Sequence, residues 1–208
     1  MAVVRILGID PGTQVVGFGC LELPKAAGAG GPGAGLPLAM RGSNVVRAAS
    51  AAGGGARLLA AGVLRLGDRK AEIPARLLSL AQQLATLLRE LEPTEVAVEE
   101  AFFGKSVQAA LRIGEARGVV LAEAARAGLS VHQYTPARVK RCVTGHGAAR
   151  KGSVAKMLAQ LLPDLSGAGC RDLPEDATDA LAVAWTRLEE LRSPMTASAS
   201  RRSGGAGV

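Results

Sequence analysis

The sequence is poor in aromatic, cysteine and histidine residues, and it lacks any long apolar run. Aromatic residues make up 2% of 208 residues, as three Phe, one Tyr and one Trp. No apolar run approaches the ~20 residues that a membrane helix needs. The N-terminus shows no basic stretch followed by a small-residue cleavage site. We therefore expect a cytoplasmic protein with no membrane association.

The few thiols and imidazoles argue against a zinc site. Cys20, Cys142 and Cys170 are odd in number, far apart and without CxxC spacing, which is typical of reduced, incidental thiols. His132 and His146 have no Cys or carboxylate partner nearby in the sequence, and we assign them no role.

What the chain does contain indicates one globular domain with a polyanionic partner. Hydrophobic residues make up 48% and charged residues 21%, and the net charge is +7. Such a positive balance favours nucleic acid as the partner. We expect a single domain over 1–192, interrupted at about 24–56 by a mobile insert rich in Gly and Ala, and a disordered tail over 193–208.

Periodicity predicts an α/β fold. A mixed five-stranded sheet flanked by helices follows from the element order: an antiparallel hairpin comes first, and helical crossovers then lead to parallel strands. We expect strands at 3–9, 14–23, 57–66, 94–100 and 129–134, with a short strand around 40–46 able to interrupt the insert. Expected helices begin at Glu72 and end before Pro93, and then span 108–127, 136–142, 152–162 and 174–191. Gly114 and Gly118, four residues apart, indicate either a dimer contact or internal helix packing.

Acidic residues lie at three separated places where they can converge. Asp10 ends the first strand, Glu99 and Glu100 end the fourth, and Asp176 and Asp179 share one side of the last helix. Each has an ordinary explanation: turn formation, a solvated strand end, or charge at a helix N-terminus. Together they would repel one another unless a multivalent cation neutralised them. An all-carboxylate set suits Mg²⁺ or Mn²⁺, and beside a phosphodiester partner it indicates two-metal hydrolysis.

Four motifs carry a family resemblance. GIDPGT, VAVEEAFF, ARVKRCVTGHGAARKGSV and PEDATDALAVAW occur in this order, and the chain resembles the RuvC family of bacterial Holliday junction resolvases over about 1–23 and 57–192. The resemblance implies a ribonuclease H-like fold, a homodimer and association with a RuvA–RuvB branch-migration complex. It also implies nicking of two strands of like polarity in four-way junction DNA, with two Mg²⁺ per active site and Mn²⁺ as a substitute.

By this resemblance, Asp10, Glu99, Asp176 and Asp179 are catalytic metal ligands, and Glu100 lies outside that set. Lys140 and Lys151 resemble basic residues near the scissile phosphate. An exposed aromatic side chain can stack on an unpaired base; the resemblance gives this part to Phe102, whereas Phe103 has core filling as its competing explanation. The predicted DNA contacts are Phe102, Phe103, Lys105, Arg112, Arg117, Lys140, Arg141, Arg150 and Lys151.

Three other functions remain open from the sequence. An RNA-directed nuclease of the same fold would carry the same acids. A nucleotide-binding protein of the actin-like fold shares the GIDPGT pattern, although this chain lacks the length for two lobes and a second phosphate loop. A DNA-binding protein without catalysis would gain nothing from four carboxylates facing phosphate.

Overall fold

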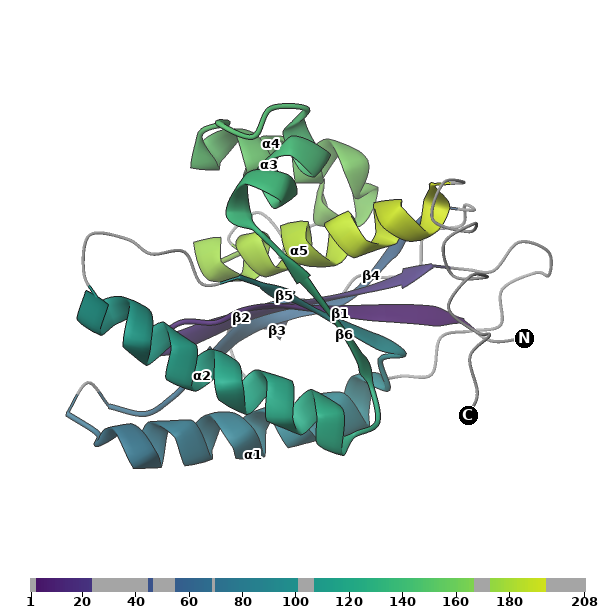
Figure 1. The fold of residues 1–208 in the computed structure, drawn as a ribbon. Coiled ribbons are helices and arrows are strands. Elements are labelled where there is room, and N and C mark those ends of the chain that lie inside the picture. Colours follow the sequence, from purple (N-terminus) through teal and green to yellow (C-terminus); the bar gives the residue numbers. More distant parts are fainter. Residues whose placement is uncertain are drawn as a thin grey trace, which may run out of the picture.

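The computed structural model describes residues 3–23, 45–46, 55–68, 70–100, 107–166 and 173–193. A twisted sheet forms the middle layer (Figure 1). Helices α1 (Ile73–Leu91) and α2 (Val107–Arg126) cover one face of the sheet, and α5 (Glu175–Arg192) covers the other. The short helices α3 (Pro136–Thr144) and α4 (Lys151–Leu161) pack on the outer side of α5, and a 3₁₀ turn follows at Pro163–Ser166.

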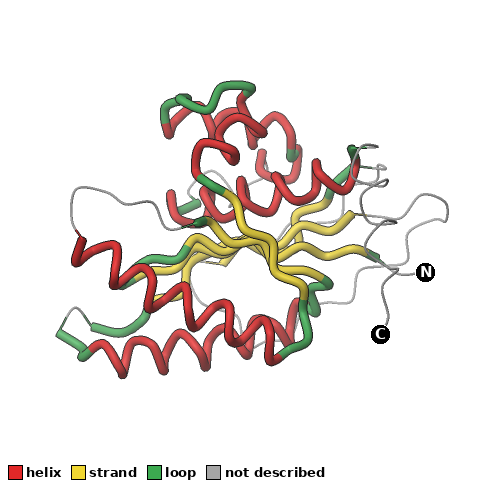
Figure 2. Tube along the Cα trace, viewed as in Figure 1, coloured by secondary structure: helices red, strands yellow, loops and turns green. Residues whose placement is uncertain are grey.

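The sheet confirms the predicted mixed topology. Its strands run in the order β3-β4-β2-β1-β5-β6. β1 pairs antiparallel with β2 and parallel with β5, and β5 continues parallel to β6. Figure 2 shows the strands, in yellow, between the helices, in red. The sheet has six strands where five were expected, because a two-residue strand in the insert adds to its edge. The strands are β1 (Val4–Asp10), β2 (Val15–Leu23), β3 (Val45–Val46), β4 (Arg57–Arg65), β5 (Glu95–Glu99) and β6 (Ser130–Tyr134).

Local sequence explains the ends of the helices. Pro74 lies in the first turn of α1, where its fixed φ suits the helix and its missing N–H is not needed. Glu92 ends α1 with a φ of 46°, and Pro93 follows. Thr135 caps α3 by accepting a hydrogen bond from the Arg138 backbone N–H, and Gly145 ends that helix with a φ of 80°. The expected helix bounds are therefore correct to within a residue or two.

The central strands separate two apolar cores. On the first face, Leu7, Ile9, Val96 and Val98 pack with leucines of α1 and small residues of α2. On the second face, Ile6 and Ala97 pack with α5 and the helices stacked on it. Alternate residues of β1 and β5 thus point to opposite faces, and both strands are buried on both sides.

Helix α5 approaches the sheet closely because glycines lie beneath it. A Cβ added at Gly8 of β1 would lie 2.1 Å from the Ala180 carbonyl oxygen, and one added at Gly17 of β2 would lie 1.9 Å from the Asp176 carbonyl oxygen. Both atoms belong to the helix backbone, so they cannot rotate away as a side chain could. The absence of side chains at these two positions therefore fixes the height and position of α5 over β1 and β2.

The division of the chain into one domain, an insert and a tail stays a prediction. Most of the expected insert and residues 194–208 lie outside the described residues. Within the part of the chain that the structure describes, no helix has the length and apolar character needed to cross a membrane.

Replacing Gly8 with Ala should destabilise the protein. The new methyl group would overlap the α5 backbone, and overpacking of this kind typically costs ~1–3 kcal/mol. Gly152→Ala is the control, because a Cβ there meets nothing within 4 Å. Urea unfolding should show a lower free energy of unfolding for Gly8→Ala only. Equal stability of the two variants would mean that α5 does not rest on β1 as described.

Candidate active site

Strand register places Asp10 beside Glu99. β1 and β5 are parallel, with Ile9 opposite Val98, and the two acids are the next residues along their strands. Ile9 and Val98 belong to the core on the α1–α2 side, so alternation directs Asp10 and Glu99 toward α5. Tyr134, the register partner of Glu99 on β6, belongs to the α5-side core as well. Two carboxylates from separate strands thus meet on one face at one edge of the sheet.

The start of α5 brings Asp176 and Asp179 to the same edge. The Asp176 carbonyl oxygen lies over Gly17, which is the register partner of Asp10 on β2. Asp179 directly precedes Ala180, whose backbone lies over Gly8, two residues before Asp10. Asp176 is exposed and Asp179 is half-buried. The fold therefore brings all four predicted acids to the carboxyl ends of β1 and β5.

The four acids lie at the same end of the sheet, but they do not form a closed set of metal ligands. Among the described residues, no group of three or more His, Cys, Asp or Glu is placed to hold a metal ion. Asp10, Glu99 and Asp179 each take part in a hydrogen bond, ion pair or other electrostatic interaction within the protein. The donor set contains only carboxylate oxygens, which suits a hard divalent cation such as Mg²⁺.

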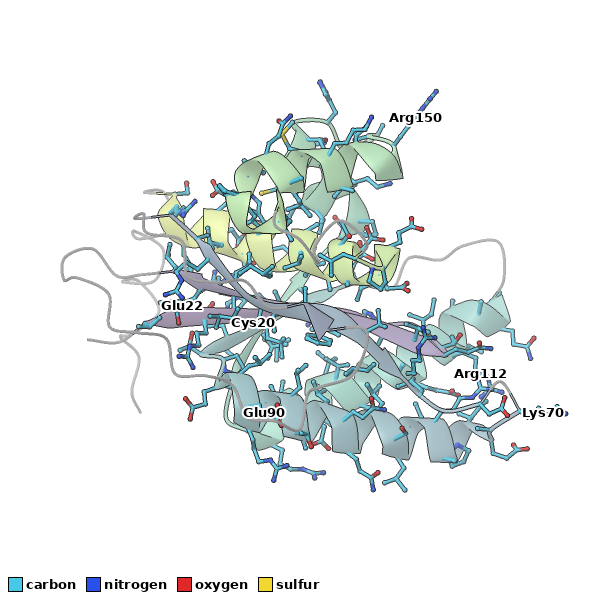
Figure 3. All side chains as sticks on the ribbon, turned by 180° about the vertical axis from the view of Figure 1, so that it is seen from behind. Cys20, Glu22, Lys70, Glu90, Arg112 and Arg150 are labelled. Atoms are coloured by element: carbon cyan, nitrogen blue, oxygen red, sulfur yellow. The ribbon has the colours of Figure 1, made fainter. Side chains whose placement is uncertain are left out.

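Basic residues belong to helices on both faces of the sheet. Lys140 and Arg141 belong to α3, and Arg150 immediately precedes α4. Lys151 is the first residue of α4, but its side chain lies outside the described part. Figure 3 shows Arg150 and Arg112 on the same side of the molecule, one on the α5 side of the sheet and the other on the α2 side. A polyanion crossing the carboxylate edge would meet positive charge in both directions.

Several predicted DNA contacts have partners within the protein or lie outside the described residues. Arg112 pairs with Glu115 one turn along α2, and Arg117 donates to the Gln133 side chain on β6. Residues 101–106, which include Phe102, Phe103 and Lys105, lie outside the described part of the chain. The predicted contacts stay predictions.

Two of the cysteines hold free thiols, and His132 lies beside a carboxylate, with its Nε2 3.5 Å from Glu95 Oε2. Cys20 is a buried free cysteine whose pKa is raised to about 12 by burial, and Cys142 is also free. Cys170 lies outside the described residues. Burial and the charge of Arg187 lower the pKa of His132, so the imidazole is neutral at physiological pH.

An ionic network, which the sequence did not reveal, fastens the far half of α5 to the sheet. Arg187 on α5 donates to Glu95 at the start of β5, with Nε 2.6 Å from Oε2 and Nη2 3.3 Å from Oε1. Glu190, one turn later, accepts hydrogen bonds from the Tyr134 hydroxyl and from Arg138 of α3. Only the three-residue spacing of Arg187 and Glu190 hinted at this arrangement. The network holds α5, and with it Asp176 and Asp179, against β5, β6 and α3.

The network lowers the pKa of Glu190. Burial by itself would raise this pKa, but the Tyr134 hydrogen bond and the charges of Arg138 and Arg187 outweigh it and lower the pKa below its ordinary value. Burial, followed by the hydrogen bond to Glu190, raises the pKa of Tyr134, so the phenol stays protonated and can donate. The ionised carboxylate is therefore the form that the fold stabilises.

Comparison with known proteins identifies relatives along most of the chain. The family model described as "Crossover junction endodeoxyribonuclease RuvC" matches residues 34–187. The crossover junction endodeoxyribonuclease RuvC of Heliobacterium modesticaldum is 37% identical over 181 residues, which cover 86% of this chain and 90% of that protein. The protein of the same name from Pelobacter propionicus is 36% identical over 187 residues, which cover 89% of this chain and 86% of that protein.

Solved structures agree with the sequence comparison. The structure of T. thermophilus RuvC in complex with a Holliday junction substrate superposes with a TM-score of 0.67 at 29% identity, covering 91% of this chain and 95% of that one. The yeast mitochondrial Holliday junction resolvase Ydc2 superposes with a TM-score of 0.58 at 13% identity, which shows a shared fold.

Glu190→Gln should lower stability at neutral pH and have less effect in acid. The folded-state pKa lies below the unfolded value of about 4.3, so the stabilisation is complete above that pH and is lost as pH falls through the folded pKa. Losing a hydrogen-bonded charge should cost ~1–2 kcal/mol at pH 7. Free energies of unfolding measured from pH 3 to 7 should converge for the two proteins at low pH. Glu189→Gln, which loses only an exposed pair with Arg192, should change little throughout, and an equal loss in both variants would contradict the network.

Proposed function

Because this chain belongs to the RuvC family of crossover junction endodeoxyribonucleases, we propose that it resolves Holliday junctions by hydrolysing phosphodiesters at the edge formed by Asp10, Glu99 and the start of α5. The substrate is four-way junction DNA, and the protein acts in the cytoplasm during recombination and DNA repair. The observation that carries the proposal is the convergence of carboxylates from β1, β5 and α5 at one edge, in a protein with a net charge of +7.

The four acids would hold a pair of Mg²⁺ ions, with Mn²⁺ as a substitute. Asp10 and Glu99 would supply oxygens from the ends of buried strands, and Asp176 and Asp179 would supply them from the first turns of a helix. When bound, such ions lower the pKa of an attacking water and neutralise charge that develops on phosphate oxygens. Lys140 and Lys151 would hold the scissile phosphate in line with this edge by direct charge–charge contact.

The outer face of α2 supports a homodimer. Val107 and Leu111 are 72% and 65% exposed, and Gly114 and Gly118 continue their line along the helix at spacings of three and four residues. A Cβ added at either glycine meets nothing within 4 Å, so internal packing does not explain these residues. Exposed Ala122 and Ala125 extend the same stripe. Two copies can bring their α2 helices close together through such small side chains.

A two-fold dimer of this kind would give the proposed activity its symmetry. Two identical active sites related by a two-fold axis present the same edge to two strands of a four-way junction. Strands of like polarity are related by the same symmetry, so both are nicked in equivalent positions. The expectation of a RuvA–RuvB partnership rests on the family resemblance.

Asp10→Asn should abolish Mg²⁺-dependent junction cleavage, because a neutral amide cannot balance the charge of the cations. Junction binding should be retained or increase, since a negative charge near phosphate is removed. Glu100→Gln is the matched control: its neighbour Glu99 points toward α5, so alternation turns Glu100 away from the site. Cleavage of labelled four-way junction, linear duplex and RNA–DNA hybrid, with and without Mg²⁺, measures both activity and selectivity. Parallel loss of binding and cleavage would make Asp10 a structural residue, and preference for the hybrid would indicate an RNA-directed enzyme.

Leu111→Asp should convert the dimer to a monomer, since two buried carboxylates would face each other across the two-fold axis. Sedimentation equilibrium measures the mass directly. Leu191→Asp serves as the control, because Leu191 is another exposed leucine, 37% accessible, on α5 at the opposite face of the sheet. A Leu111→Asp protein that remains dimeric would place the dimer contact elsewhere.

A further inference from the structure

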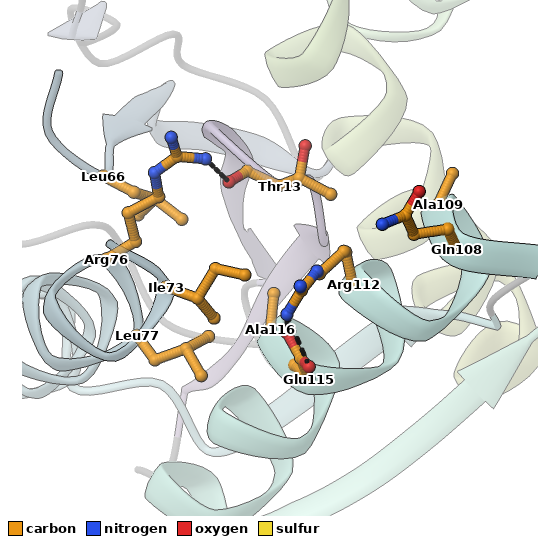
Figure 4. Close-up of a pocket in the computed structure, with 10 residues that line it drawn as sticks. All are labelled: Thr13, Leu66, Ile73, Arg76, Leu77, Gln108, Ala109, Arg112, Glu115 and Ala116. Carbon is orange, nitrogen blue, oxygen red and sulfur yellow. Dashed lines mark hydrogen bonds and ion pairs between the residues drawn. The ribbon is translucent and has the colours of Figure 1, made fainter. Parts of the chain in front are cut away.

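A pocket of about 370 Å³ opens at the carboxylate edge, on the opposite face of the sheet from α5. It lies between the first turns of α1 and α2 and the turn that follows β1 (Figure 4). Ile73, Leu77 and Ala116 form part of its wall. Polar groups come from three separate segments of the chain: Thr13, Arg76, Gln108, Arg112 and Glu115.

The pocket adjoins the candidate active site through the backbone. Thr13 follows Asp10 by three residues, in the turn between β1 and β2. Gln108 lies in the first turn of α2, the next helix after Glu99. Asp10 and Glu99 point toward α5, whereas the pocket belongs to the side covered by α1 and α2. A nucleic acid strand passing over the carboxylates and around the sheet edge would reach the pocket next.

The polar lining favours an anion. Arg76 is half-buried on α1 and donates from Nη1 to the Thr13 carbonyl oxygen at 3.5 Å, which directs its guanidinium toward the turn (Figure 4). Arg112 enters from α2 on the other side. The first turns of both helices contain no acidic residue, and Glu72 at the N-cap of α1 makes no capping hydrogen bond through its side chain.

Among the residues that line the pocket, Glu115 is the one carboxylate that opposes this charge, and its contact with Arg112 is weak. Arg112 Nη1 lies 3.0 and 3.1 Å from the two Glu115 oxygens. The side chains of this pair are 41% and 39% exposed, and ion pairs this open to water add little stability. Arg112 can therefore leave Glu115 and bind a more highly charged anion with little loss of free energy. A phosphate offers more charge and a geometry that guanidinium groups match.

We propose that this pocket binds one backbone phosphate of the junction strand, a short distance from the phosphate that is cleaved. Arg76 and Arg112 are positioning residues that grip the phosphate from two helices, and Gln108 and Thr13 offer further hydrogen bonds to it or to its sugar. The contact fixes the strand's register over the carboxylates without reading sequence. This inference rests on the proposed junction-cleaving function and adds a second anchoring point on the other face of the sheet.

The test measures junction affinity against salt in an Asp10→Asn background, where DNA stays intact. Arg76→Gln and Arg112→Gln should each weaken binding about tenfold, as expected for a lost charge-assisted contact. The double variant should also reduce the slope of log affinity against log salt by about 0.9, the value for one phosphate. Because both arginines contact the same phosphate, each single variant should lose less slope than the double variant. Glu115→Gln should bind more tightly, since the competing carboxylate is gone.

Arg89→Gln is the control, because Arg89 lies in the last turn of the same helix as Arg76 and lines no part of the pocket. It should leave both affinity and salt slope unchanged. Thermal unfolding of each variant separates folding defects from binding defects. If an arginine variant unfolds, the opposite sign expected for Glu115→Gln still tests the proposal. Unchanged affinity in a folded Arg76→Gln or Arg112→Gln protein would overturn it.

A second measurement locates the phosphate. A series of junctions is made in which one phosphate near the cleavage site is replaced by an uncharged methylphosphonate, at a different position in each junction. With both arginines present, replacement at one of these positions should weaken binding. At that position the double arginine variant should bind modified and unmodified junctions equally. The absence of any such position would overturn the inference, while junction cleavage by the unaltered protein would leave the proposed function standing. Failure of the unaltered protein to cleave junctions would instead refute the proposed function.

Discussion

The close contact between the α5 backbone and the glycines of β1 and β2 is the constraint on which the candidate site depends. Gly8 and Gly17 leave no room for a Cβ beneath the helix. Because the helix lies so low, its first turns reach the level of the strand ends, where Asp10 and Glu99 emerge. Any larger residue at these positions would lift or shift the helix, and Asp176 and Asp179 would move with it. The glycines beneath α5 thus determine how close the helix carboxylates lie to the strand carboxylates.

The sheet also separates the carboxylates from the arginine-lined pocket at the same edge. Alternation along β1 and β5 sends the carboxylates toward α5, while the face beneath α1 and α2 carries the arginine-lined pocket. The four carboxylates and the pocket arginines are therefore separated by a layer of backbone, and a polyanion can contact both by passing around the edge. The ionic network of Glu95, Arg187 and Glu190 secures α5 at the other end of its length, so the helix is held by packing at its start and by charge farther along.

Much of this could be predicted from local sequence. Apolar runs that end in Asp10 and Glu99 predict buried strands with acids at their rims, and Pro74 and Pro93 predict the limits of α1. The four motifs predict the family. The pocket and the network escaped prediction because their members come from distant segments: Arg76 meets the turn at Thr13, and Glu190 meets Tyr134, only after the chain has folded. The strand Val45–Val46 has the same origin, since two residues form a strand only when an edge such as β4 is present to pair with them.

The sequence by itself determined which elements form, which residues carry charge and which family the chain belongs to, because propensity, periodicity and motif spacing act over short distances along the chain. The tertiary structure decided which face each acid points to, which arginines share a pocket and how near α5 lies to the sheet. Those properties depend on strand register and on contacts between residues far apart in the chain, and a shift of one register position would send Asp10 or Glu99 to the other face.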